Sequence, residues 1–99
     1  MITRIWHGKT ESKHADSYLK YIQETGLKDY LATTGIISAK ILRKIDGDFC
    51  HFYTITEWKD LESIINFAGV DYKKARYYPE DKEYLLEFEE TVEHYESFY

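Results

Sequence analysis

The alternation of apolar and polar residues is clearest between Ile36 and Trp58, where it predicts a β-hairpin. Two runs of β-branched and aromatic residues, 36–45 and 49–58, are joined through Asp46-Gly47-Asp48. An Asp-Gly pair between two such runs is the strongest short-range signal for a hairpin turn. Both alternating sets in each run contain apolar side chains, whereas a strand with one solvated face alternates more cleanly. We therefore expect both faces of the sheet to be covered, one of them by a second copy of the chain.

Helical spacing of apolar residues marks two further segments. The stretch from Ser12 to Leu31 carries one apolar stripe, and Gly26 inside it predicts a kink or a break. A shorter helix is expected after Asp60, which is a good N-cap, and Gly69 is expected to end it. Pro79, followed by two acidic residues, predicts the start of one more helical turn.

Residues 2–7 and 91–98 alternate like strands and complete the element order β-α-β-β-α-β. This order is typical of the ferredoxin-like, split-βαβ arrangement of the α+β class. Right-handed crossovers then place the first and third strands in the centre of an antiparallel sheet, with the helices on one face. A chain of 99 residues without a linker or repeat is expected to form one domain, 1–99.

Composition and charge restrict the partners of this domain. The chain is 43% hydrophobic and 17% aromatic and carries a net charge of −5, which argues against a nucleic-acid or anionic-membrane partner. No apolar run approaches the roughly 20 residues of a membrane span. The single Cys50 agrees with a reducing compartment. We expect a soluble cytoplasmic protein with no membrane partner, and we interpret the glutamates at 87–96 as a solvated face.

The segment Thr54-Ile55-Thr56-Glu57-Trp58-Lys59-Asp60-Leu61-Glu62-Ser63 resembles the strand-to-helix segment of a known superfamily. It is similar to the antibiotic-biosynthesis-monooxygenase-like domains of the dimeric α+β barrel superfamily, and the element order agrees over the full chain. The resemblance implies a homodimer whose two sheets pack face to face, with a pocket between sheet and helices in each subunit. Members include cofactor-free monooxygenases of polycyclic phenols, heme-degrading enzymes and small-ligand binders, so the fold does not by itself imply one activity.

The heme-degrading branch of that superfamily carries an Asn, a Trp and a His where this chain has His7, Phe67 and Tyr77. These departures argue against heme oxygenation, although tyrosinate is a known heme ligand. The expectation is a protein that works without a cofactor.

Histidines are the first candidate functional residues. In the predicted topology His7, His51 and His94 fall at the same end of the sheet. Three alternatives follow. Three imidazoles on one face are suited to bind a metal, a single imidazole is suited to act as a general base near neutral pH, and histidines also make purely structural hydrogen bonds. Cys50 and His51 are consecutive in a strand and therefore point to opposite faces. We select His7 and His51 as candidate catalytic bases and predict no metal site.

Aromatic residues are the second candidate set. Tyr72, Tyr77 and Tyr78 lie in a segment without a regular pattern, where ligand contacts often occur. With Trp58 and Phe67 they are expected to line a flat slot for an aromatic ligand, whereas core packing is the alternative explanation.

Two functional hypotheses follow from these residues. The first is a cofactor-independent monooxygenase that acts on an aromatic or quinol-like small molecule in the pocket between sheet and helices, with His7 or His51 removing a proton. The second is a non-catalytic homodimeric module of the same fold that binds a small ligand or is purely structural. A pocket with a convergent polar group of perturbed ionisation favours the first, and a pocket filled by aromatic side chains favours the second.

Overall fold

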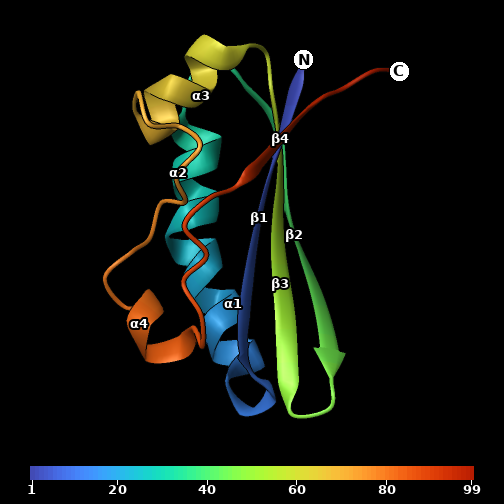
Figure 1. Cartoon of the computed structure of the whole chain (residues 1–99), viewed down its shortest axis with the longest axis vertical. Coiled ribbons are helices and arrows are strands. Elements are labelled where there is room, and N and C mark those ends of the chain that lie inside the picture. Colours follow the sequence, from blue (N-terminus) through green and yellow to red (C-terminus); the bar gives the residue numbers. More distant parts are fainter.

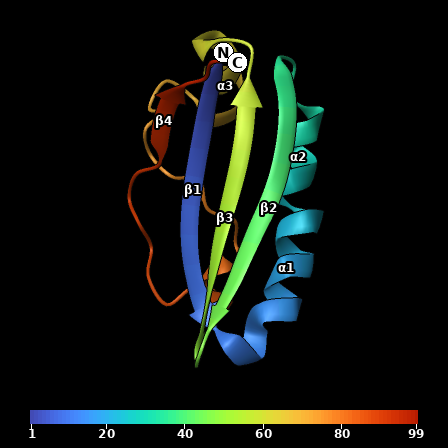
Figure 2. The same cartoon turned by 90° about the vertical axis from the view of Figure 1, so that its right-hand side faces the viewer.

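A four-stranded antiparallel sheet with its helices on one face forms the body of the molecule (Figure 1). The computed structural model describes residues 1–99. The strand order is β2-β3-β1-β4, with bounds β1 (Ile2–Glu11), β2 (Ile36–Asp46), β3 (Phe49–Trp58) and β4 (Glu93–Glu96). The predicted α+β class, the hairpin and the central position of the first and third strands are confirmed. Figure 2 shows β1, β3 and β2 side by side with the helices behind or beside them.

The helical region after β1 is divided close to where the sequence predicts a break. A short 3-10 turn (Ser12–His14) leads into α1 (Ala15–Glu24), and α2 (Gly26–Ala32) follows. The break falls at Thr25, one residue before Gly26, because the Thr25 backbone leaves helical geometry at φ −115° and ψ −88°. The two helices lie end to end along the sheet (Figure 1). No helix of the chain is both long enough and apolar enough to cross a membrane.

Helix α3 (Leu61–Ala68) has the ends predicted from the sequence. The Asp60 carboxylate accepts a hydrogen bond from the Ser63 backbone N–H at 2.9 Å, and Gly69 ends the helix at φ 86°. Helix α4 (Asp81–Tyr84) is the short turn expected after Pro79, and it begins two residues later than that proline. These local signals correctly determine both helices because each depends only on neighbouring backbone groups.

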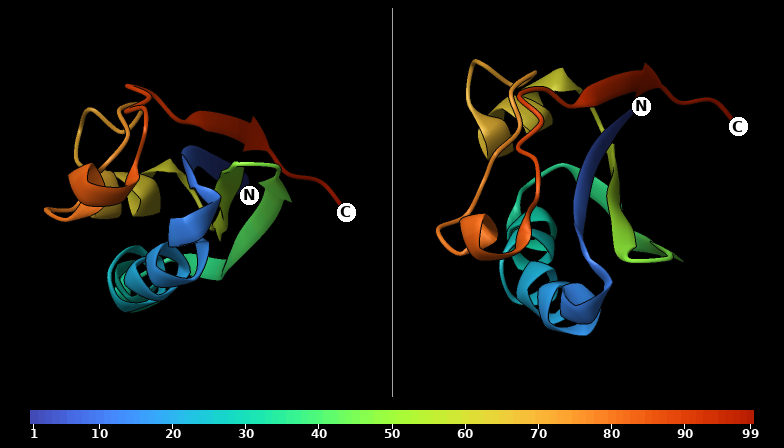
Figure 3. Two further views of the ribbon diagram at one scale, coloured as in Figure 1. Left: turned by 90° about the horizontal axis from the view of Figure 1, so that it is seen from below. Right: turned by 60° about the horizontal axis from the view of Figure 1, so that its bottom comes forward.

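The last strand is shorter than predicted. Alternation indicates a strand over 91–98, but β4 pairs only with Ile2–Ile5 of β1. Thr91 and Val92 pair instead with Lys74 and Lys73 of the connector between α3 and α4. The segment before β4 therefore runs along the remaining free edge of β1, where the Leu86 N–H donates to the Lys9 carbonyl at 2.9 Å. Beyond β4 the chain extends away from the body of the molecule (Figure 3).

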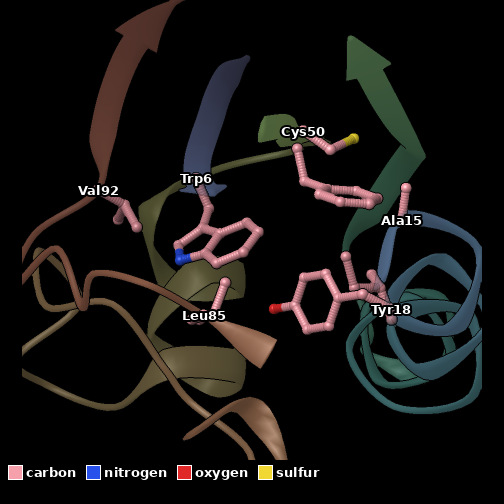
Figure 4. Close-up of a cluster of buried hydrophobic side chains, with 8 residues drawn as sticks. Trp6, Ala15, Tyr18, Cys50, Leu85 and Val92 are labelled. Carbon is pink, nitrogen blue, oxygen red and sulfur yellow. The ribbon is translucent and has the colours of Figure 1, made fainter. Parts of the chain in front are cut away.

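The core lies between the sheet and the helices in two clusters. Figure 4 shows the larger one, in which the Tyr18 ring projects from α1 toward Trp6 and Leu85. The smaller cluster consists of Tyr30, Trp58, Ile64 and Phe67. Phe52, Cys50 and Trp58 of β3 are fully buried on this face, in agreement with the packing explanation for many of the aromatic residues.

The opposite face of the sheet is uncovered in the single chain. Its side chains alternate with the buried ones and come from all four strands. They include Ile5, His7, Lys40, Leu42, Lys44, His51, Tyr53, Ile55, Glu93 and Tyr95. Leu42, Tyr53 and Tyr95 remain 44%, 37% and 53% exposed. The prediction that both faces carry apolar groups therefore agrees with the register of the strands.

A pair of glycine substitutions tests the contact between the start of β2 and α3. Gly35 has φ +94°, and a Cβ there would lie 1.9 Å from Ser63 Oγ, which its bond to Asp60 holds in place; Gly47 has φ +60° and open space around it. We expect Gly47→Ala to cost about 1–2 kcal/mol, because only the left-handed backbone is penalised. Gly35→Ala is expected to lower the free energy of unfolding, measured in urea, by more than Gly47→Ala does, because its Cβ also collides with Ser63. Equal losses in the two variants would contradict the close approach.

Candidate functional site

A small pocket opens between the centre of the sheet, the junction of α1 with α2, and the connector before α4. Its free volume is about 30 Å³. This is room for roughly two or three water molecules, since a water requires about 10–15 Å³. The residues that give it chemical character are Arg4, Tyr18, Tyr30, Arg76, Tyr78 and Asp81. We refer to it as the helix-side pocket.

Asp81 is a buried carboxylate in the wall of the helix-side pocket, where it is only 4% exposed. The Tyr18 hydroxyl donates to its Oδ1 at 2.9 Å, and the Tyr78 backbone N–H donates to its Oδ2 at 2.6 Å. Burial raises the pKa of Asp81, and these two donors oppose that rise. The carboxylate is thus closer to accepting a proton near neutral pH than an exposed aspartate is.

Asp29 of α2 holds the connector against the helices. The Tyr78 hydroxyl donates to Asp29 Oδ2 at 2.6 Å, and an Arg76 guanidinium nitrogen lies 3.5 Å from the same oxygen. Arg76 also donates to the Phe67 carbonyl at 3.0 Å. Burial raises the pKa of Tyr78, so its hydroxyl remains a donor at neutral pH.

Arg4 reaches the helix-side pocket from the central strand β1. It is 2% exposed, forms no ion pair, and its Nε has no hydrogen-bond partner. Its Nη2 donates a long bond of 3.4 Å to the Lys74 carbonyl, and its Cζ lies 5.4 Å from the Phe67 ring centroid. Burial lowers the pKa of Arg4 because an apolar environment disfavours the charged form.

Sequence reasoning overlooked both Arg4 and Asp81. A signal existed for Arg4, which alternates in phase with the buried Trp6 on a central strand, where a charge is unusual. For Asp81 no such signal existed, because an acidic residue after proline is explained equally well by the helix dipole.

The two candidate catalytic histidines lie together, but on the uncovered face of the sheet. His7 Nε2 and His51 Nδ1 are 2.9 Å apart, and the rings stack at 5.2 Å. The Glu89 carboxylate bonds His7 Nδ1, so this glutamate is engaged with a histidine and is not simply part of a solvated face. His7 also packs on Tyr53 at 4.8 Å between ring centroids. The sheet separates this pair from the helix-side pocket.

His94 does not join the other two histidines, and the expected convergence of all three at one end is wrong. It pairs with Arg4, five residues along β1 from the partner of His51, and it faces the helices. Tyr72 packs edge-on against it at 5.3 Å, and burial lowers the pKa of His94. The register of β4 is the reason, because β4 pairs with the first residues of β1 and sets His94 opposite Arg4.

The five residues of the predicted aromatic slot occupy four different environments. Trp58 and Phe67 pack on one another in the smaller core cluster. Tyr72 lies near His94, and Tyr77 packs edge-on against Trp6 at 6.4 Å while donating to the Glu89 carbonyl. Of the five, Tyr78 lines the helix-side pocket. The structure does not bring them together as one flat slot.

The link between Tyr18 and Asp81 has a measurable consequence for ionisation. In Tyr18→Phe the carboxylate loses one donor that favours its charged form, so the pKa of Asp81 is expected to rise further. A ¹³C NMR titration of the aspartate side chains checks this. Tyr84→Phe is the matched control, since Tyr84 packs on the Tyr18 ring at 5.3 Å without bonding Asp81. An unchanged pKa of Asp81 in Tyr18→Phe would contradict the hydrogen bond.

Comparison with known proteins supports the fold. No protein-family model matches the chain, and no curated protein matches it. Among solved structures it is similar to one titled "Putative antibiotic biosynthesis monooxygenase from Nitrosomonas europaea", with a TM-score of 0.70, 12% sequence identity and coverage of 100% of both chains. Likeness at this identity establishes the fold and not the activity. The α+β fold predicted from the sequence, an antiparallel sheet with helices on one face, is therefore confirmed, and this solved structure shares it over the full chain.

Proposed function

We propose that the chain is a homodimeric, cofactor-independent oxygenase that acts on a phenol-like or quinol-like aromatic molecule at the helix-side pocket. The observation that carries this proposal is Asp81, a buried carboxylate whose pKa is raised, in a wall shared with Tyr18 and Tyr78. A pocket with a convergent polar group of perturbed ionisation is typical of an active site. The fold likeness to a monooxygenase-like protein supports the same reaction class.

The reaction begins when Asp81 accepts the hydroxyl proton of a phenol, which gives an electron-rich phenolate. The phenolate passes an electron to dioxygen, and the ring carbon para to the oxygen forms a C–O bond with the reduced dioxygen. Asp81 returns its proton to the peroxide oxygen. The C–H bond at that carbon then breaks, its electron pair forms the second C–O bond, and the O–O bond breaks to release water. One phenol and one dioxygen give one quinone and one water.

This assignment differs from the sequence-based hypothesis, which gives the proton acceptor role to His7 or His51. Both imidazoles lie across the sheet from the helix-side pocket. His7 and His51 therefore take no part in a reaction in that pocket. Any function of this histidine pair would be on the uncovered face of the sheet.

The second hypothesis, a non-catalytic binding module, has its own supporting observation. Pockets for drug-sized ligands usually measure about 300–1,000 Å³, whereas the helix-side pocket offers about 30 Å³. An aromatic ring enters fully only if Tyr78 and Arg76 move, and both are bonded to Asp29. Absence of turnover together with retained ligand binding would favour this hypothesis.

The uncovered face supports the homodimer. Lys40 and Lys44 of β2 lie at one edge of this face, Glu93 of β4 lies at the other, and Leu42 and Tyr53 lie between the edges. A two-fold axis parallel to the strands sets β2 of one protomer opposite β4 of its partner, so the basic edge meets the acidic edge. The apolar centres of both faces are then buried against each other.

Oxygen consumption with a panel of phenols and dihydroxy-aromatic compounds tests the proposed reaction. We expect Asp81→Asn to slow consumption by about 10²–10⁴-fold, the range for loss of a general base. Glu80→Gln, which neutralises the adjacent exposed carboxylate, is expected to keep the wild-type rate, as is His7→Ala. Full activity in Asp81→Asn, or its loss in His7→Ala, would show that the acceptor is a different group.

Sedimentation equilibrium at micromolar concentration tests the dimer. Tyr53→Glu places a charge in the centre of the uncovered face, and we expect it to convert the dimer to a monomer because an unpaired buried charge is strongly disfavoured. Ser17→Glu, on the exposed side of α1, is expected to remain dimeric. A folded wild-type chain that sediments as a monomer would refute the proposed assembly.

A further inference from the structure

The buried guanidinium of Arg4 forms no ion pair with a carboxylate. Burial of a charge is costly unless the charge is paired and hydrogen-bonded. Arg4 forms no ion pair; its contacts are the long bond to the Lys74 carbonyl, the Tyr30 hydroxyl and the Phe67 ring, and its Nε is without a partner.

The other charged groups around the helix-side pocket do not neutralise Arg4. Arg76 stacks on the same Phe67 ring at 4.8 Å and adds a second positive charge, which Asp29 pairs at 3.5 Å. Asp81 lies in the pocket wall but is bonded to Tyr18 and Tyr78. Arg76 is therefore paired with Asp29, Asp81 is held by neutral donors, and no carboxylate forms an ion pair with Arg4.

We propose that Arg4 is an oxyanion-binding residue that receives the negatively charged oxygen of an aryl carboxylate or phenolate in the helix-side pocket. A guanidinium presents its donors in a planar fork that suits such an oxygen group. The free volume of about 30 Å³ accommodates the oxygen group but not the ring. The ring then lies at the opening, beside Thr25, Arg76 and Tyr78, which are the less buried members of the wall.

This inference rests on the proposed function for the identity of the site and defines its substrate class. An arginine at the phenolate oxygen stabilises the anion that Asp81 generates, so it favours the deprotonated substrate. An aryl carboxylate has the same oxygen chemistry but no phenolic proton to lose. Benzoate is therefore a ligand for Arg4 that is not a substrate for oxygenation.

Benzoate binding to the full chain tests the role of Arg4, with Trp6 in the pocket wall as the fluorescent reporter. We expect saturable quenching by benzoate and none by the neutral analogue benzyl alcohol. In Arg4→Met the affinity for benzoate is expected to fall about 10- to 100-fold, the range for loss of a charge-assisted hydrogen bond. Arg43→Met is the control, because Arg43 lies on the same face of the sheet but pairs with Asp16 at 2.8 Å.

Thermal unfolding separates binding from a purely structural role. If Arg4 is kept for binding at the expense of stability, Arg4→Met raises the Tm in the absence of ligand, whereas an arginine that mainly supports the core would lower it. Arg4→Lys keeps the charge without the planar fork and is expected to bind benzoate more weakly than the wild type. It serves as the second variant if Arg4→Met does not fold.

The outcomes distinguish this inference from the proposed function. Absence of saturable benzoate binding in the wild type, or equal binding in the Arg4 variants, overturns the oxyanion site even if oxygen is consumed. Benzoate binding that depends on Arg4, in a protein that consumes no oxygen with any phenol, supports the oxyanion site and rejects the oxygenase.

Discussion

The register of β1 between β3 and β4 is the constraint on which the chemistry of both faces depends. Successive side chains of a strand point to opposite faces, so a shift of one residue would exchange every side chain between core and surface. In the observed register Arg4 and Trp6 face the helices, whereas Ile5 and His7 face outward. One strand thus supplies the buried cation of the helix-side pocket and the histidine of the outer pair.

Most polar groups inside the core are paired, and the exceptions are Arg4 Nε, Trp6 Nε1 and His94 Nε2. Tyr18 donates to Asp81, Tyr78 donates to Asp29, and the Tyr30 hydroxyl shares a hydrogen bond with Thr54. Buried hydroxyls in proteins are nearly always paired in this manner. Of these three, Arg4 is the one permanent charge, and it forms no ion pair. Ligand binding explains why this buried arginine is left without a charged partner while the buried tyrosines are hydrogen-bonded.

The fold and the activity are supported by different kinds of observation. The similarity to a solved monooxygenase-like structure covers the whole chain, but 12% identity does not carry functional residues from one protein to the other. The proposed activity instead rests on Asp81 and its hydrogen bonds, and the proposed assembly rests on the charges and apolar groups of the uncovered face. Each can fail without affecting the other or the fold.

The sequence by itself determined those features that depend on neighbouring residues. The Asp46-Gly47 turn, the Asp60 cap and the Gly69 stop each involve backbone groups a few residues apart, so the hairpin and α3 were predictable. The late start of β4 and the position of Glu89 beside His7 were decided by pairing between distant segments, which alternation does not encode. The pairing of His7 with His51, the separation of His94, and the burial of Arg4 and Asp81 in one pocket likewise required the tertiary structure. Strand register and the path of the connector bring such residues together, and both are set by contacts across the whole chain.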